Sequence, residues 1–227
     1  MVVIAYVRHG KRDSTPETIF RDGSPGTIPC FLTKEGTMQA HQAGKELSKL
    51  NISRIISSPL DRALQTASLI DYEYFTKTGI YLNIEFPEHL LIERQAGKLN
   101  NGPVPGGVPW LDFRNSQART GYPDLEPFDR IKRRIERFVN KVQMKKSAGG
   151  LIVASTHQDT IHAAVAQALG YDELNAMFNP GVTEGSITII SYGAGANARK
   201  EKPMIITYGN TRLSESEIKQ IEELLRL

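Results

Sequence analysis

The 227-residue chain is poor in several residue types and patterns, and each shortage excludes a class of protein. It has one cysteine, Cys30, which excludes an internal disulfide and a cysteine-based metal cluster. It has no apolar run near the length of a membrane span, and its first ten residues lack the charged leader of a secretory signal. We therefore expect a cytoplasmic protein with no membrane partner.

A large excess of one charge is also missing. The 28 Lys and Arg residues barely outnumber the 25 Asp and Glu residues, for a formal net charge of +3. The densest basic stretch lies within residues 128–146, where apolar residues recur at helical spacing, and it is typical of the solvated face of an amphipathic helix. A nucleic-acid-binding protein usually carries a more concentrated basic stripe, so we expect no nucleic-acid partner.

What the sequence does contain is an alternation of short apolar runs and helical patterns. It predicts strands at 2–7, 52–57, 81–86, 151–156, 186–192 and 204–209, and helices at 34–50, 59–76, 128–146, 158–169 and 214–226. Such alternation is typical of a parallel sheet covered on both faces. The predicted fold class is α/β: a three-layer sandwich with a mostly parallel central sheet, helices on both faces and a small cap insertion.

The expected insertion spans about residues 87–127. This stretch is rich in proline and glycine and holds the only tryptophan, Trp110. Such a composition suits a cap over one end of the sheet better than a part of its core. We expect one domain over residues 1–227, with this cap as its insertion and no domain boundary elsewhere.

Polar residues that could take part in catalysis or bind an anion lie at the ends of two predicted strands and at the start of a predicted helix. His9 and His157 each come directly after an apolar strand, so parallel strands would place them at the same sheet edge. Arg8 precedes His9 and offers a planar fork for phosphate oxygens. Arg62 lies in the first turn of a helix, where free N–H groups attract anions. Each residue alone also has an ordinary structural interpretation, as a packed histidine or a surface arginine.

Taken together, these segments resemble the histidine phosphatase superfamily, which includes cofactor-dependent phosphoglycerate mutase. The matching pieces appear in family order and run from Val3 to about Tyr192. They read VRHG, LTKEGTMQAHQAGKEL (32–47), SSPLDRALQTAS (57–68), LLIERQAGKLNNG (90–102), STHQDTI (155–161) and GVTEGSITII (181–190).

The resemblance implies a role for each matching residue. His9 corresponds to the nucleophile, whose imidazole attacks phosphorus and leaves a phosphohistidine. Arg8, Arg62 and His157 correspond to the phosphate pocket, and His157 is counted among the catalytic residues. Arg12 stands where a second branch of the family has a further arginine that contacts phosphate.

The resemblance implies that Glu93 is the general acid, which protonates the leaving oxygen and later activates water. Asp159 is the reserve candidate, because the second branch has a His-Asp pair late in the chain. Here Gln158 separates His157 from Asp159. The surroundings of Glu93 resemble the first branch, which favours Glu93.

The function implied is therefore a phosphatase that hydrolyses a small phosphomonoester through a phosphohistidine, with no metal and no other cofactor. Phosphoglycerate mutase-type phosphoryl transfer and binding of a phosphorylated ligand without turnover remain alternatives. Trp110 and Phe113 in the expected cap favour a small phosphorylated metabolite over a protein substrate. The sequence leaves a homodimer open.

Overall fold

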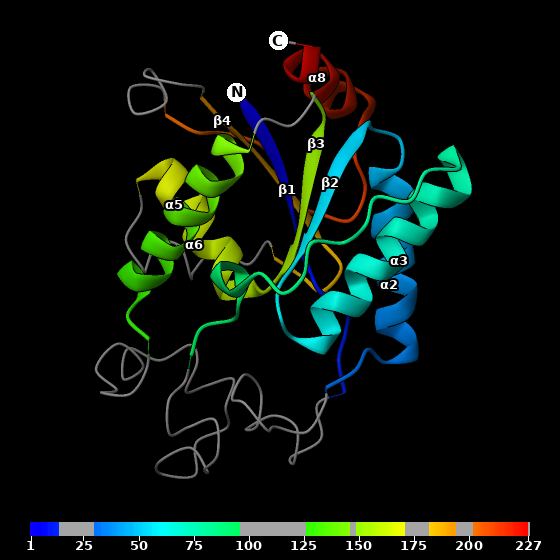
Figure 1. Cartoon of the computed structure of the whole chain (residues 1–227), viewed down its shortest axis with the longest axis horizontal. Coiled ribbons are helices and arrows are strands. Elements are labelled where there is room, and N and C mark those ends of the chain that lie inside the picture. Colours follow the sequence, from blue (N-terminus) through cyan, green and yellow to red (C-terminus); the bar gives the residue numbers. More distant parts are fainter. Residues whose placement is uncertain (14–29, 96–125, 146–148, 171–181, 194–201, 227) are drawn as a thin grey trace.

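A five-stranded sheet forms the centre of the protein (Figure 1). The computed structural model describes residues 1–13, 30–95, 126–145, 149–170, 182–193 and 202–226. Its strands are β1 (Val2–Arg8), β2 (Ile52–Ser57), β3 (Leu151–Thr156), β4 (Ile187–Tyr192) and β5 (Met204–Asn210), in the spatial order β2-β3-β1-β4-β5.

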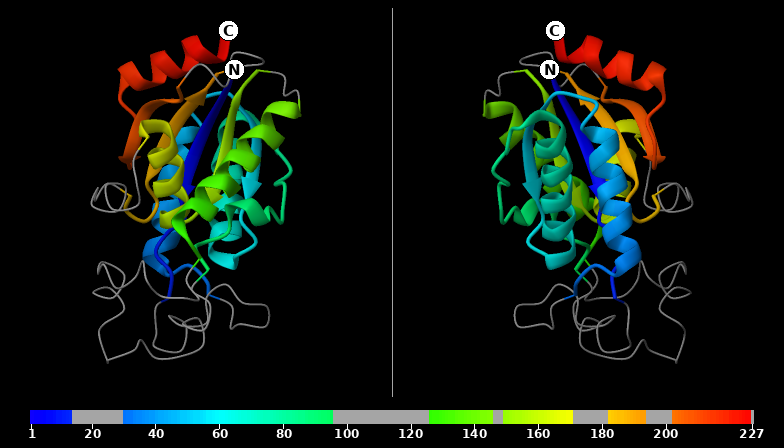
Figure 2. Two further views of the ribbon diagram at one scale, coloured as in Figure 1. Left: turned by 90° about the vertical axis from the view of Figure 1, so that its left-hand side faces the viewer. Right: turned by 90° about the vertical axis from the view of Figure 1, so that its right-hand side faces the viewer.

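Helices cover both faces of this sheet (Figure 2). They are α2 (Lys34–Leu47), α3 (Asp61–Thr78), the 3₁₀ turn η1 (His89–Leu91), α5 (Phe128–Met144), α6 (Gln158–Leu169) and α8 (Glu215–Arg226). The pair α2 and α3 packs on one face and the pair α5 and α6 on the other. This arrangement confirms the predicted α/β sandwich. None of the helices within the described ranges is long and apolar enough to cross a membrane.

The sheet is mixed, with parallel strands at its centre. β2, β3 and β1 run parallel, whereas β4 pairs antiparallel with β1 and β5 antiparallel with β4. The parallel registers join Arg8 to Thr156 and Ser57 to Ser155 at the ends of the strands. The carboxyl ends of β1, β2 and β3 therefore meet at one edge, as the sequence predicts for His9 and His157.

Alternate residues of β1 supply the two apolar layers. Ile4 and Tyr6 pack with the helix pair α5 and α6, and Val3, Ala5 and Val7 pack with α2, α3 and α8. All five side chains are at most 1% exposed. A central strand that is buried on both faces is rigid, and the residue that follows it is held in place accordingly.

The prediction of a strand at 81–86 is wrong. Within this segment only Glu85 makes a β-bridge, to Ile56 of β2. Asn83 has a positive φ of 51°, which interrupts an extended strand. Leu82 and Ile84 pack against the core, but Tyr81 and Phe86 are 59% and 48% exposed. The segment is irregular and meets the outer edge of β2 at Glu85, which exchanges backbone hydrogen bonds with Ile55 and Ser57.

The helix that carries Arg62 begins later than expected. Asp61 is its first residue and Leu60 its N-cap, so Pro59 lies before the helix instead of at its first position. Ser58 still pairs with β3, because its N–H donates to the carbonyl of Ser155 at 3.0 Å, and residues 59–60 form a bend before the helix. Most of the expected cap, residues 96–125, lies outside the described residues, as do residues 194–201 between β4 and β5.

We predict that Phe138→Ala lowers the free energy of unfolding by about 3–5 kcal/mol, because a large buried side chain is lost and a cavity remains. Phe138 is 0% exposed and its ring lies 6.4 Å from that of Tyr6. Urea unfolding of the variant measures the loss. Met144→Ala on the same helix, where the side chain is 78% exposed, should change stability by less than about 0.5 kcal/mol. Similar losses in both variants would contradict the packing described.

Candidate active site

His9 is held by both ring nitrogens. Nδ1 lies 2.8 Å from the carbonyl oxygen of Gly10, and Nε2 lies 2.9 Å from Nε of Arg62. A carbonyl oxygen only accepts and a guanidinium only donates, so Nδ1 carries the proton and Nε2 presents a lone pair. The backbone N–H of His9 also donates to the carbonyl of Thr156 at 3.0 Å. The strand end and these contacts fix a neutral imidazole in one tautomer.

Arg62 joins the two histidines of the site. It lies in the first turn of α3 and is 2% exposed. Its Nε donates to His9, and its Nη2 lies 3.1 Å from Nδ1 of His157. The planar fork therefore fixes two rings at once, and it sets their centroids 5.2 Å apart.

His157 is the N-cap residue of α6 and is 0% exposed. Its Nδ1 accepts from Arg62, so Nε2 carries the proton and donates to Oγ of Ser58 at 2.7 Å. Ser58 is fixed in turn, because its N–H donates to the carbonyl of Ser155 at 3.0 Å. His157 is thus a neutral donor fixed beside the start of a helix.

The environment keeps both histidines uncharged. Burial is the largest cause that lowers the pKa of His9 well below its ordinary value, and the charges of Arg62, Arg8 and Arg12 lower it further. The hydrogen bond to the Gly10 carbonyl acts in the opposite direction. Burial likewise lowers the pKa of His157 well below its ordinary value, followed by the charges of Arg62 and the other site residues.

The two other arginines of the expected pocket add their charge to the same place. Nη1 of Arg8 donates to the carbonyl of Val182 at 2.7 Å, and its Nη2 lies 3.5 Å from a carboxylate oxygen of Glu184. Nη1 of Arg12 lies 3.4 Å from Sγ of Cys30. The charges of both arginines lower the pKa of His9 and of His157, which places them within electrostatic range of the two rings.

Glu93 follows η1 in a segment that is fastened to the end of β3. The hydroxyl of Thr156 donates to the carbonyl of Leu91 at 2.6 Å, and that of Thr160 donates to the carbonyl of Ile92 at 2.9 Å. These two threonines flank His157 along the chain. The backbone that leads into Glu93 therefore lies against the end of β3 and the start of α6, on either side of His157, and Glu93 itself is partly buried.

The reserve candidate, Asp159, lies in the first turn of α6 and is 6% exposed. Its position at a helix start stabilises its negative charge, which suits an acceptor better than a proton donor. His162, expected to be a packed or surface histidine, is packed, at 2% exposed.

Gly10 packs closely against another backbone segment. A Cβ at this position would collide with the carbonyl of Gly36. The close approach is thus to the first turn of α2. The N–H of Gly10 donates to Oγ1 of Thr66 at 3.1 Å, so α2 and α3 together fix the carbonyl that orients His9.

The structure therefore brings His9, Arg62 and His157 into direct contact and surrounds them with charge from Arg8 and Arg12. Sequence reasoning missed Ser58, Thr66 and Glu184, which fix the ring of His157, the backbone of Gly10 and the guanidinium of Arg8. The first two lie in the SSPLDRALQTA stretch, where a polar residue at a strand end and one a helical turn after Arg62 could have indicated them.

Within the described ranges, no group of three or more His, Cys, Asp or Glu side chains could hold a metal ion. The positive charge that the structure shows at the site belongs to arginines. Such a cluster can bind a tetrahedral anion through guanidinium and imidazole N–H groups, and the Nε2 lone pair of His9 becomes available to the anion's central atom when Arg62 turns its N–H to the anion.

The chain matches a known protein family along most of its length. The profile of the histidine phosphatase superfamily (branch 1) matches residues 4–202. The 2,3-bisphosphoglycerate-dependent phosphoglycerate mutase of Thermoplasma acidophilum is 26% identical over 224 residues, covering 95% of this chain and 96% of that protein. The adenosylcobalamin/alpha-ribazole phosphatase of Salmonella typhimurium is 25% identical over 175 residues, covering 72% of this chain and 77% of that protein.

Solved structures share the fold. The structure of YhfR from Bacillus stearothermophilus superimposes with a TM-score of 0.71 at 19% identity, covering 96% of this chain and 100% of that chain. A mycobacterial glucosyl-3-phosphoglycerate phosphatase gives a TM-score of 0.67 at 22% identity, covering 90% of this chain and 96% of that chain. These likenesses extend to the whole layered architecture.

The lowered histidine pKa values predict how stability changes with pH. Below about pH 6.5 a histidine takes up a proton in the unfolded chain, whereas His9 and His157 stay neutral in the folded protein. The unfolded state then binds more protons, so the free energy of unfolding falls as pH falls below about 7, by at most about 1.4 kcal/mol per pH unit for each histidine.

Urea unfolding between about pH 7.5 and about pH 5.5 measures this slope, with both pH limits set roughly one unit from the ordinary histidine pKa. The variant His9→Asn should show a shallower slope than the wild type, because one buried neutral histidine is gone. Equal slopes in the two proteins would show that His9 does not resist protonation.

Proposed function

Because the chain belongs to the histidine phosphatase superfamily, we propose that it hydrolyses a small phosphomonoester through a phosphohistidine on His9. The observation that carries the proposal is the tautomer of His9. Nδ1 donates to the Gly10 carbonyl at 2.8 Å, and Nε2 keeps its lone pair towards Arg62. A nucleophilic imidazole needs this state, and the low pKa of His9 keeps it populated at neutral pH.

In the first half-reaction, Nε2 of His9 attacks phosphorus and the bond from phosphorus to the ester oxygen breaks. Arg62 exchanges its bond to Nε2 for one to a phosphoryl oxygen. The carbonyl of Gly10 stabilises the positive charge that the ring acquires, since it already accepts from Nδ1. Glu93 donates its proton to the leaving oxygen, which departs as an alcohol.

In the second half-reaction, the Glu93 carboxylate takes a proton from water while the water oxygen attacks phosphorus. The bond between phosphorus and Nε2 breaks, which restores neutral His9, and inorganic phosphate leaves. Arg8, Arg12, Arg62 and the Nε2–H of His157 stabilise the equatorial oxygens during both transfers. For that, His157 exchanges its bond to Ser58 for one to the phosphoryl group.

A second candidate is a mutase, which returns the phosphoryl group to another hydroxyl of the substrate. It is favoured by the match to the Thermoplasma acidophilum phosphoglycerate mutase along 95% of this chain. Against it, Ala96 stands where the mutases that resemble this chain have a tyrosine. Incubation with 3-phosphoglycerate and a bisphosphoglycerate primer separates the two: isomerised product indicates a mutase, and free phosphate indicates a phosphatase.

A third candidate, binding of a phosphorylated ligand without turnover, is disfavoured because the nucleophile and acid candidates are both present. It would gain support if no substrate in a panel of phosphorylated metabolites released phosphate. A small metabolite is the proposed substrate class. The same panel, tested with the wild-type protein and with a variant that lacks the His9 side chain, is also the way to identify the substrate.

We predict that His9→Asn lowers phosphate release from p-nitrophenyl phosphate by roughly 10³-fold or more, because no other lone pair replaces Nε2. The control His89→Asn removes an exposed histidine of η1 and should leave the rate unchanged. Circular dichroism checks that both variants fold. Ordinary turnover by folded His9→Asn would refute the assigned nucleophile.

We also predict that phosphatase activity survives EDTA, because three arginines supply the positive charge that stabilises the transferring phosphoryl group. The measurement is kcat/KM for the same substrate before and after dialysis against the chelator. Activity that disappears on chelation and returns with a divalent ion would overturn this part of the proposal.

A further inference from the structure

The chain on both sides of Glu93 is held by hydrogen bonds to segments that are distant in the sequence. Before Glu93, three consecutive carbonyls accept such bonds. Nη1 of Arg134 donates to the carbonyls of Leu90 at 2.8 Å and Ile92 at 3.0 Å. The carbonyl of Leu91 accepts from Thr156, as described above. These three carbonyls are satisfied by side chains of β3 and α5, so the placement of this segment depends on those two elements.

After Glu93, the contacts come from Glu126. Its carbonyl accepts from Nε of Arg94 at 2.7 Å, and its Oε2 accepts from the N–H of Gln95 at 3.2 Å. Its own N–H donates to the carbonyl of Gln95 at 2.8 Å. The segments 90–95 and 126–127 therefore run side by side just before α5 begins.

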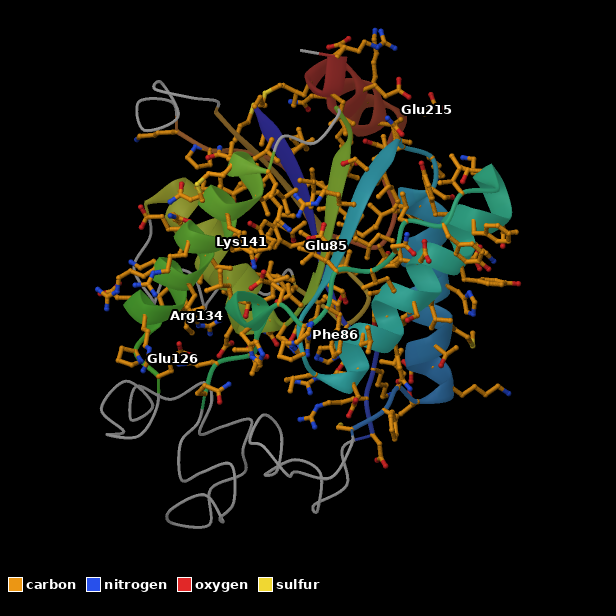
Figure 3. The ribbon with its side chains drawn as sticks, in the orientation of Figure 1. Glu85, Phe86, Glu126, Arg134, Lys141 and Glu215 are labelled. Carbon is orange, nitrogen blue, oxygen red and sulfur yellow. The ribbon has the colours of Figure 1, made fainter. Side chains whose placement is uncertain are left out.

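Arg134 and Glu126 are themselves one unit. Nε of Arg134 lies 2.9 Å from Oε1 of Glu126, and Nη2 lies 2.9 Å from Oε2. The two side chains are only 12% and 4% exposed, and both lie at the lower end of α5 in Figure 3. A bidentate pair this buried is rigid, and the remaining N–H groups of the fork are left to bind the Leu90 and Ile92 carbonyls.

We infer that the Arg134–Glu126 pair is a positioning device that holds Glu93 in place as the general acid. The inference rests on the proposed function and deepens it. Arg134 fixes the backbone before Glu93 and Glu126 fixes it after, so the pair sets where the Glu93 carboxylate meets the leaving oxygen. Arg134 does not touch the substrate itself and acts through Glu93.

Two more ion pairs join α5 and its C-cap to the segment that precedes Glu93. Lys141 donates to Glu88, and Nζ of Lys145 lies 3.1 Å from Oε2 of Glu85. Arg134 and Lys141 lie on one side of α5, seven residues apart, and Lys145 is the C-cap residue just beyond its end. Figure 3 shows Arg134 and Lys141 on the helix, with Glu85 towards the sheet. The ion pairs of Glu85 and Glu88 are more exposed and hold the segment less firmly. The position of Glu93 therefore depends most on Arg134.

The requirements of proton transfer explain why the position of Glu93 matters for the rate. A general acid acts only within hydrogen-bond reach of the oxygen that it protonates, and a misplacement of about 1 Å can cost about 10²-fold in rate. Only esters with a poor leaving group need the acid. p-Nitrophenolate leaves unaided, whereas an alkoxide must be protonated as it departs.

The test compares kcat/KM for p-nitrophenyl phosphate with that for an alkyl ester, glycerol 2-phosphate, in the intact protein. Glu93→Gln should lower the alkyl-ester rate by about 10²-fold or more and the p-nitrophenyl rate far less. Arg134→Gln should reproduce this selectivity, with about 10- to 10²-fold loss on the alkyl ester alone. Arg134→Lys should recover part of it. Arg137→Gln, an exposed arginine three residues further along α5, should change neither rate.

A double-mutant cycle completes the test. Once Glu93 is replaced by Gln, the additional change Arg134→Gln should produce no further selective loss, because the acid that it positions is gone. If Arg134→Gln fails to fold by circular dichroism, the cycle is run with Arg134→Lys, whose selective loss is smaller but of the same kind.

Each failure has its own signature. Equal losses on both esters in a folded Arg134 variant, while Glu93→Gln remains selective, would make Arg134 merely structural and overturn this inference alone. Absence of selectivity in Glu93→Gln itself would remove the general acid from the proposed function, and the inference with it.

Discussion

The guanidinium of Arg62 donates to both histidines of the site from a position that is only 2% exposed. Burial and, after it, this cation make a proton on the facing ring nitrogens costly, so both rings stay neutral and each presents a defined nitrogen. The remaining contacts of the site follow from this constraint. His9 can then donate only through Nδ1, to Gly10, and His157 only through Nε2, to Ser58.

The sheet supplies the rigidity that this constraint needs. Strands β1, β2 and β3 are parallel, and their registers bring the residues that follow Arg8, Ser57 and Thr156 together at one edge. Arg62 reaches them from the first turn of α3, which begins only after the chain has left that edge. The site is thus built from strand ends and helix starts, where free backbone groups are available to an anion.

The sequence predicts this architecture well where its signals are local. The apolar runs of β1 and β3 are such signals. Another is Thr33, whose residue type favours an N-cap and whose side chain does accept from the N–H of Gly36 at 3.1 Å at the start of α2. The expected strand at 81–86 fails because a left-handed Asn83 interrupts an alternating pattern. Arg134 was predicted to lie on a solvated face, but its partner Glu126 comes from just outside the helix. Such tertiary pairing is invisible in periodicity. The catalytic and phosphate-binding roles of these residues came from the family resemblance and remain predictions, for His9, Glu93, His157, Arg8, Arg62 and Arg12 alike.

The central claim is that His9 is a neutral imidazole with its proton on Nδ1 and its lone pair on Nε2. Nitrogen NMR of the protein labelled with ¹⁵N-histidine measures this directly, with His9→Asn assigning the signals. At pH 7 we expect the two His9 nitrogens to show the Nδ1–H tautomer, with Nε2 at the shift of an unprotonated nitrogen. A charged ring, or a proton on Nε2, would contradict the account.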